Sequence, residues 1–330
     1  MSLGTWPAPV RRLDLHLPRG VSLYLKDEGR VSPIYGGNKV RKLERALAAA
    51  AETDAPVVTG GAAGSHHALA TALHARHLGL RVHLVLCPQP DTPDARAHLA
   101  RTAGAATRVV TTPTGRSLAP AIQQVADGLA QRGTAPPVVL PLGGSCAAGV
   151  AGSVDLGLEL AQDIHAGRLP QPSQVFLAAG SGGTAAGVWM GLRLGGIESE
   201  VVAVRVAPRR LVASDRLLHL AGKAAEWLAL PAASVPRSAE GLRIDHSQVG
   251  AGYATPSTDA RAAAAEVRPH GLELEETYTG RALAACLAAV REGRTGPDVV
   301  FVQTASQAPL PPAGPVPPRL ASLLRAGATR

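Results

Sequence analysis

The chain has 330 residues, of which 46% are hydrophobic, and this length suits two domains or one large α/β domain. Its net charge is +8, yet the arginines are scattered and only 3% of residues are aromatic, which argues against a nucleic-acid binder. Three widely spaced cysteines, the lack of an N-terminal leader pattern and the lack of a long apolar run predict a cytoplasmic protein without a membrane span.

Predicted strands and helices alternate along most of the chain. Residues 10–27 indicate short strands, with an edge strand at 21–26, and a glycine turn leads into a helix over about 39–51. Further strands are predicted at 56–60, 81–86, 107–111, 138–142, 174–179, 201–207 and 299–302, and further helices at 65–78, 94–103, 118–131, 184–194, 211–228 and 281–291. Apolar strands that alternate with helices are typical of α/β folds with mostly parallel sheets.

Two such sheets are expected, each in a three-layer domain. We predict a small domain at 45–152 and a large domain formed by 1–44 together with 153–330, with a crossover near 141–145. The proline-rich end, 309–330, is predicted to be an extended surface tail.

Lysine occurs only four times, and two of the four, Lys39 and Lys42, follow a Gly-Gly-Asn turn. Arginine can hold a phosphate, but only a lysine amine can form a Schiff base with an aldehyde. Residues three apart share one face of a helix, and a helix start favours an anion. We therefore predict that Lys39 holds an aldehyde while Lys42 neutralises a phosphate. The alternative is two solvated lysines on an amphipathic helix.

A second glycine cluster lies between an apolar run and a helical one. It consists of Gly180, Ser181, Gly182, Gly183 and Thr184. Glycines let the backbone approach phosphate oxygens closely, and the two hydroxyls add donors. Without a Walker lysine or complete GxGxxG spacing, nucleotide binding is disfavoured, and a tight strand-to-helix turn is the alternative. One lysine amine and one phosphate-sized nest together predict pyridoxal phosphate as cofactor.

Segment 36–44, Gly-Gly-Asn-Lys-Val-Arg-Lys-Leu-Glu, resembles the lysine motif of the D-cysteine desulfhydrase and 1-aminocyclopropane-1-carboxylate deaminase family. These are fold-type II pyridoxal-phosphate enzymes of the tryptophan synthase β superfamily. Segments that resemble the family follow in order at 64–67, 141–145, 179–184, 252–253 and 278–282. The resemblance implies that the large domain binds the cofactor and that the protein is a homodimer.

Catalytic roles follow from the resemblance residue by residue. It implies that Lys39 forms the Schiff base with the cofactor and then moves the Cα proton of the substrate. Ser65 would bind the substrate carboxylate or assist at the substrate, while Tyr253 and Tyr278 would line the site. The resemblance also implies that Thr279 faces the pyridine nitrogen. A hydroxyl there cannot protonate the ring as an acid would, which favours β-elimination or replacement over transamination.

Cofactor contacts are implied in the same way. Lys42 and the glycine cluster at 180–184 would hold the phosphate, and Thr304 is retained in a late segment near the ring. The chain also departs from the family pattern. His66 stands where the family usually has Asn beside the 3′-oxygen of the cofactor. Cys146 also replaces an Asn, and Gln303-Thr-Ala-Ser replaces His-Thr-Gly-Gly.

We therefore predict a pyridoxal-phosphate lyase or deaminase acting on a small amino acid and releasing a keto acid and ammonia. Desulfhydration of a D-cysteine-like substrate ranks first, because Thr279 stands where the deaminases more often have Glu. A β-replacement synthase and a cofactor-binding protein without turnover are the alternatives. No metal site is predicted, because the adjacent residues His66 and His67 point in different directions on a helix, and His74 and His77 add no convergent spacing.

Overall fold

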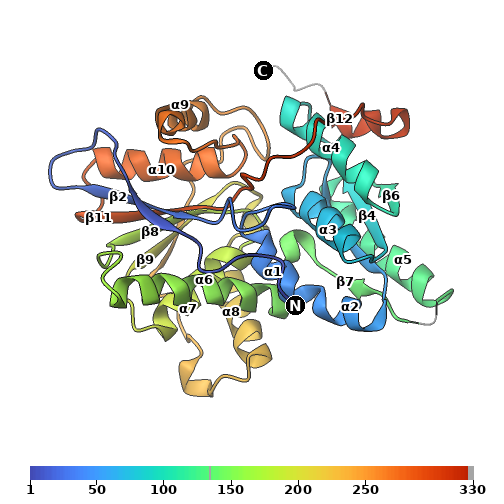
Figure 1. Ribbon diagram of the computed structural model, residues 1–330, viewed down its shortest axis with the longest axis horizontal. Helices are drawn as coiled ribbons and strands as arrows, with labels where there is room; N and C mark the ends of the chain where they lie inside the picture. The colour runs from blue at the N-terminus through green and yellow to red at the C-terminus, as the bar shows by residue number, and fades with distance from the viewer. Residues whose placement is uncertain (134, 326–330) are drawn as a thin grey trace.

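The computed structural model describes residues 1–133 and 135–325. Two separate sheets are arranged side by side, each with helices against it (Figure 1). The pairing of β1 with β2 is antiparallel, and the other pairings within the two sheets are parallel. The prediction of an α/β fold with mostly parallel sheets is thereby confirmed.

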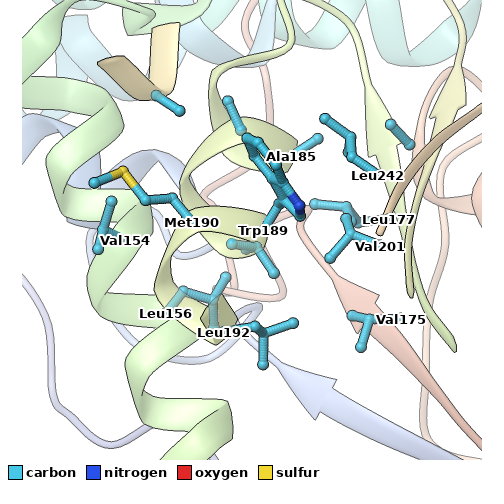
Figure 2. Packing of buried hydrophobic residues seen from close by; sticks show 14 of the residues in the cluster. Val154, Leu156, Val175, Leu177, Ala185, Trp189, Met190, Leu192, Val201 and Leu242 are labelled. Atoms are coloured by element: carbon cyan, nitrogen blue, oxygen red, sulfur yellow. The ribbon is translucent and has the colours of Figure 1, made fainter. Parts of the chain in front are cut away.

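The larger sheet has six strands in the order β1-β2-β11-β8-β9-β10. Its strands are β1 (Val10–Leu13), β2 (Ser22–Asp27), β8 (Gln174–Ala179), β9 (Glu200–Arg205), β10 (Leu242–Asp245) and β11 (Asp298–Gln303). One face packs against α6 (Ala147–His165), α7 (Gly183–Leu194) and α8 (Ser214–Trp227), and the other against α9 (Thr258–Val267) and α10 (Thr279–Arg291). Figure 2 shows Trp189 of α7 packed among hydrophobic side chains in the core between the sheet and α6, α7 and α8.

The smaller sheet has four strands in the order β6-β4-β3-β7. Its strands are β3 (Val57–Ala62), β4 (Val82–Cys87), β6 (Arg108–Thr111) and β7 (Val138–Val139). Around it lie α1 (Lys39–Ala46), α2 (Ala48–Thr53), α3 (His66–His77), α4 (Pro93–Ala105) and α5 (Leu118–Ala130). The strands of this sheet all lie within the predicted small domain, whereas the predicted boundary at 152/153 falls inside α6. The domain limits stay a prediction.

Helix α6, which the sequence analysis did not predict, is the longest helix of the described chain, with 19 residues. Glycine is a poor helix former, so a segment with glycines at 149, 152 and 157 gives a weak helical signal. Packing explains these glycines. A Cβ at Gly152 would lie 2.1 Å from the carbonyl oxygen of Arg41, and one at Gly157 would lie 2.4 Å from that of Val188. The glycines therefore allow α1 and α7 to approach α6 closely. Helix α9 and strand β10 were also not predicted.

Two further predictions differ from the structure. Strand β2 is not an edge strand, because it pairs with β1 on one side and with β11 on the other. The proline-rich segment is extended, but it ends in an anchored turn rather than a surface tail. There Leu320 and Leu323 are buried, and β12 (Leu324–Arg325) pairs with β5 (Gln89–Pro90). Residues 326–330 lie outside the described residues. In the described part of the chain, no helix is long and apolar enough to cross a membrane.

Candidate active site

A cavity of about 290 Å³ lies where the carboxyl ends of strands from both sheets meet. The ends of parallel strands are the usual place for a ligand in open α/β sheets. The predicted residues that line the cavity are Lys39, Lys42, Ser65, His66, Gly180, Ser181, Gly182, Thr184, Tyr253, Tyr278 and Thr304. Segments that are far apart in sequence are thus brought to one place. The remaining two predicted residues do not line it, but Gly183 adjoins Lys42 and Thr279 donates to Glu275, and both of these neighbours line the cavity.

Lys39 begins α1 directly after the predicted glycine turn. The turn needs Gly37, which has φ +86° and whose Cβ, if present, would lie 2.5 Å from the carbonyl oxygen of Thr304. The Lys39 Nζ donates to Asn38 Oδ1 at 2.7 Å, and Asn38 Nδ2 donates to Thr184 at 2.7 Å. Burial lowers the pKa of Lys39 to about 8, although Glu275 opposes the shift. Near neutral pH the uncharged, nucleophilic form of this amine is therefore more populated than that of an ordinary lysine.

Lys42 lies one turn further along α1 and is only 2% exposed. Its Nζ donates to the carbonyl oxygen of Gly143 at 3.1 Å, and no carboxylate of the described residues pairs with it. Burial and the neighbouring Lys39 lower the pKa of Lys42 to about 7. A buried amine without an anion is costly as a cation, so this position suits a ligand that supplies negative charge.

The glycine cluster forms the opposite wall of this anion site. Gly182 has φ +84°, and α7 begins at the next residue, so free backbone N–H groups are present there. A Cβ at Gly183 would lie 2.4 Å from Ser145 Oγ and 2.9 Å from Lys42 Nζ. The hydroxyls of Ser145 and Ser181 are 2.7 Å apart. Because position 183 has no side chain, Ser145 and Lys42 can approach the backbone of the nest closely, and together they form a site suited to a phosphate.

Ser65 occupies the start of α3 at the other end of the cavity. Its Oγ accepts a hydrogen bond from the backbone N–H of Ala68 at 3.2 Å, which caps the helix. The hydroxyl proton of Ser65 is not used by this cap. Together with the helix N-terminus it forms a donor site of the kind that binds carboxylates.

Glu275 is the main residue of the cavity that the sequence analysis missed. Its carboxylate accepts the backbone N–H groups of Thr277, Tyr278 and Thr279 and the hydroxyl of Thr279, all within 3.1 Å. Burial raises the pKa of Glu275, and the backbone N–H groups oppose that shift. The signal in the sequence that could have pointed to Glu275 is an acidic residue shortly before the helix predicted at 281–291. Glu275 thus holds the Thr279 hydroxyl at 3.0 Å, and the role of Thr279 toward the cofactor stays a prediction.

Tyr253 and Tyr278 share a hydrogen bond of 2.7 Å between their hydroxyls. Burial raises the pKa of Tyr253 to about 12 and raises that of Tyr278 well above its usual value, so both phenols stay protonated at neutral pH. Tyr278 also packs against the glycine cluster, since a Cβ at Gly180 would lie 2.8 Å from its ring. The pair thus supplies a proton-carrying group to the same cavity as the Lys39 amine.

Two departures from the family pattern lie away from the cavity lining. Cys146 starts α6 and packs against the core of the smaller sheet. Gln303 is fully buried and donates to the carbonyl oxygen of Glu273 at 3.3 Å. Ser306, by contrast, supports the lysine turn by accepting the backbone N–H of Gly36 at 2.9 Å. Within the described residues, no group of three or more His, Cys, Asp or Glu side chains is arranged to hold a metal ion.

Comparison with known proteins decides the family. The model of pyridoxal-phosphate dependent enzymes matches residues 1–305. The chain belongs to this family. It is 36% identical to nocardicin C-9′ epimerase of Nocardia uniformis subsp. tsuyamanensis, over 96% of this chain and 95% of the relative.

Other members of the family are similar over nearly the whole chain. Identity is 30% to a putative 1-aminocyclopropane-1-carboxylate deaminase of Pyrococcus horikoshii, over 91% of this chain and 89% of that one. Identity is also 30% to D-cysteine desulfhydrase of Klebsiella pneumoniae, over 90% of this chain and 91% of that one. Among solved structures, an ACC deaminase homologue matches with a TM-score of 0.77 and 27% identity, over 93% of this chain and 91% of that one. The predicted resemblance and the predicted cofactor are confirmed.

The residues of the cavity fit this cofactor. The uncharged form of the Lys39 amine suits an aldehyde. The nest around Gly183 suits the phosphate, whose negative charge would pair with the Lys42 amine. Ser65 and the start of α3 remain for the carboxylate of an amino acid. Which atom of the cofactor each residue contacts stays a prediction.

Proposed function

We propose that this pyridoxal-phosphate enzyme is a lyase that removes the Cα proton and a β-substituent from a small amino acid. The net reaction takes up one water and releases a keto acid, ammonia and the protonated β-substituent, which is hydrogen sulfide when the substrate is a cysteine. The names of the desulfhydrase and deaminase relatives support this class of reaction.

The observation that carries the proposal is the placement of the Lys39 amine, with its lowered pKa, in one cavity with a protonated tyrosine pair. When bound, pyridoxal phosphate withdraws electrons from the bonds at Cα and so makes the Cα proton removable. The Lys39 amine then takes that proton. Ser65 and the start of α3 orient the substrate carboxylate, and the hydroxyls of Tyr253 and Tyr278 hold a proton for the departing β-substituent.

A second candidate is inversion of configuration at Cα. Two separate proton-carrying groups, the Lys39 amine and the tyrosine pair, line one cavity, and an inversion needs one group to remove a proton and another to return it. The similarity to nocardicin C-9′ epimerase also favours this reaction.

One experiment separates the two candidates. The holoenzyme is incubated in D2O with D- and L-amino acids, including both cysteines, and proton NMR follows the Cα proton while a coupled assay follows keto acid. Keto-acid release without an added nucleophile supports the lyase. Deuterium at Cα with inverted configuration and no keto acid supports the epimerase instead. No exchange and no keto acid across the panel would contradict both.

We also propose a homodimer, as the family resemblance implies. Light scattering coupled to size-exclusion chromatography tests this, and a monomer mass at working concentration would contradict it.

A further inference from the structure

His66 is held by aromatic neighbours from three segments. It is the first residue of α3, and its Nδ1 lies 2.7 Å from the hydroxyl of Tyr35. The ring of His98 meets it edge-on with centroids 4.5 Å apart, and the ring of Tyr278 does so at 5.7 Å. The other nitrogen, Nε2, lies 3.9 Å from a carboxylate oxygen of Glu275.

These contacts determine which ring nitrogen carries the proton. Tyr35 is only 2% exposed. Among the described residues, the hydroxyl of Tyr35 has one hydrogen-bond partner, His66 Nδ1. If Nδ1 carried the proton, the buried tyrosine proton would have no acceptor, and the Nε2 lone pair would face the negative oxygen of Glu275. Both costs vanish when Tyr35 donates to Nδ1 and the proton of His66 is on Nε2.

His66 is also uncharged in this environment. Burial, with contributions from His98 and Lys39, lowers its pKa well below the usual value. Burial raises the pKa of Tyr35, so that the phenol keeps its proton as a donor. The titratable groups that face His66 are Tyr35, Lys39, His98, Glu275 and Tyr278.

The Nε2–H group therefore reaches the cavity as a donor with no acceptor at hydrogen-bond distance among the described residues. A gap of 3.9 Å to Glu275 is too long for a hydrogen bond. In pyridoxal phosphate the phenolic oxygen is on the ring carbon next to the one that bears the aldehyde. That oxygen must therefore lie near the amine that binds the aldehyde, and Lys39 and His66 line the same cavity.

We propose that Tyr35 is a positioning residue that fixes His66 as the Nε2–H tautomer, so that His66 donates a hydrogen bond to the phenolic oxygen of the bound cofactor. This inference rests on the part of the proposed function that makes Lys39 the anchor of the cofactor. It does not depend on which reaction follows.

The test is a pH titration of the visible cofactor absorption in the holoenzyme without substrate. A hydrogen bond donated to the negative phenolic oxygen makes that oxygen a weaker partner for the proton on the Lys39 nitrogen. The pKa of this nitrogen, which is the titration midpoint, is therefore kept low. Tyr35→Phe removes only the donor hydroxyl, which leaves Glu275 as the other neighbour that favours the Nε2–H tautomer. We expect the midpoint to rise by up to about one pH unit, the scale of one hydrogen bond to a charged group. Tyr24→Phe, in β2, is the matched control.

A double-mutant cycle distinguishes tautomer control from a general structural effect. Asn has no tautomers, so Tyr35→Phe is expected to leave the midpoint unchanged in the His66→Asn background. An unchanged or lowered midpoint in Tyr35→Phe alone would overturn the proposal. An equal shift in both backgrounds would overturn it too. The titration needs no turnover. If no amino acid of the panel reacts, the proposed reaction is contradicted, but the result of the titration is unaffected.

Discussion

Two lysines are almost completely withdrawn from solvent, and their surroundings are opposite. Lys26 of β2 is 0% exposed, and its Nζ lies 2.7 Å from Asp163, 2.6 Å from Glu159 and 2.7 Å from the carbonyl oxygen of Ala8. Lys42 of α1 is 2% exposed and has one carbonyl oxygen, that of Gly143, at 3.1 Å. The first lysine is satisfied by the protein, whereas the second is not.

The surroundings of Lys26 form a buried network. Arg41 joins it by pairing with Glu28 at 2.8 Å and with Glu159 at 2.8 Å. The network connects β2, α1 and α6. Arg168 also pairs with Asp163 at 2.8 Å, so three cations and three carboxylates balance one another without any ligand. A buried lysine with carboxylate partners therefore marks a structural connection, and one beside a glycine nest without such partners marks a place for a ligand's anion. Substitutions can separate these two roles.

The largest effect is expected from a third lysine, Lys39, which is partly buried. Lys39→Ala removes the group that we propose binds the aldehyde and moves the Cα proton, so turnover should fall by at least about 10³-fold and the visible absorption of the bound cofactor should disappear. Absorption spectra and the keto-acid assay measure the two losses. Lys223→Ala, which changes a half-exposed lysine of α8, is the control. Surviving visible absorption in Lys39→Ala would show that the anchor is elsewhere.

Lys26→Met should reduce stability most. It leaves Asp163 and part of Glu159 without their buried partner, which costs about 3–5 kcal/mol in the free energy of unfolding. Urea denaturation of the cofactor-free protein measures this loss. The same substitution at Lys42 should cost little or should stabilise the cofactor-free protein, because no carboxylate loses a partner. Equal destabilisation by Lys26→Met and Lys42→Met would remove the contrast between the two sites.

Lys42→Met should instead weaken cofactor binding. Loss of one charge-assisted contact to the phosphate is expected to raise the dissociation constant of pyridoxal phosphate between about tenfold and a hundredfold. Fluorescence or absorption titration of the cofactor-free protein measures it. Lys42→Arg keeps the charge and should retain part of the affinity. If Lys42→Met binds as tightly as the unaltered protein, the nest around Gly183 does not hold the phosphate.

The last expected effect is a pH dependence of the stability of the cofactor-free protein. The pKa of Lys42 is lowered from 10.5 to about 7, so between these values the unfolded chain binds more protons than the folded one. Stability should therefore rise as the pH increases from about 7 toward 10.5. Urea midpoints across this range measure the slope. Lys42→Met should reduce it to the part that comes from Lys39, whose pKa is lowered to about 8. Pyridoxal phosphate should also flatten it, because its phosphate favours the charged amine.

Local signals allowed part of this architecture to be predicted. The alternation of apolar strands and helices is a property of short segments, so the α/β class and most strands could be recognised. The lysine motif and the glycine cluster are also local. Helix α6 was not predicted, because its glycines lower helix propensity and make sense only through the close approach of α1 and α7. Strand β2 could not be recognised as interior, because its partner β11 is about 270 residues away in sequence.

The sequence by itself determined the chemistry at hand: an amine at position 39, an anion nest at 180–184 and hydroxyls at 253 and 278. Tertiary structure decided the state of those groups. The uncharged fraction of Lys39, the unsatisfied amine of Lys42, the carboxylate of Glu275 and the tautomer of His66 all depend on burial and on neighbours distant in sequence. Desolvation and hydrogen bonding set protonation, and only the folded chain fixes which groups are desolvated and which are paired.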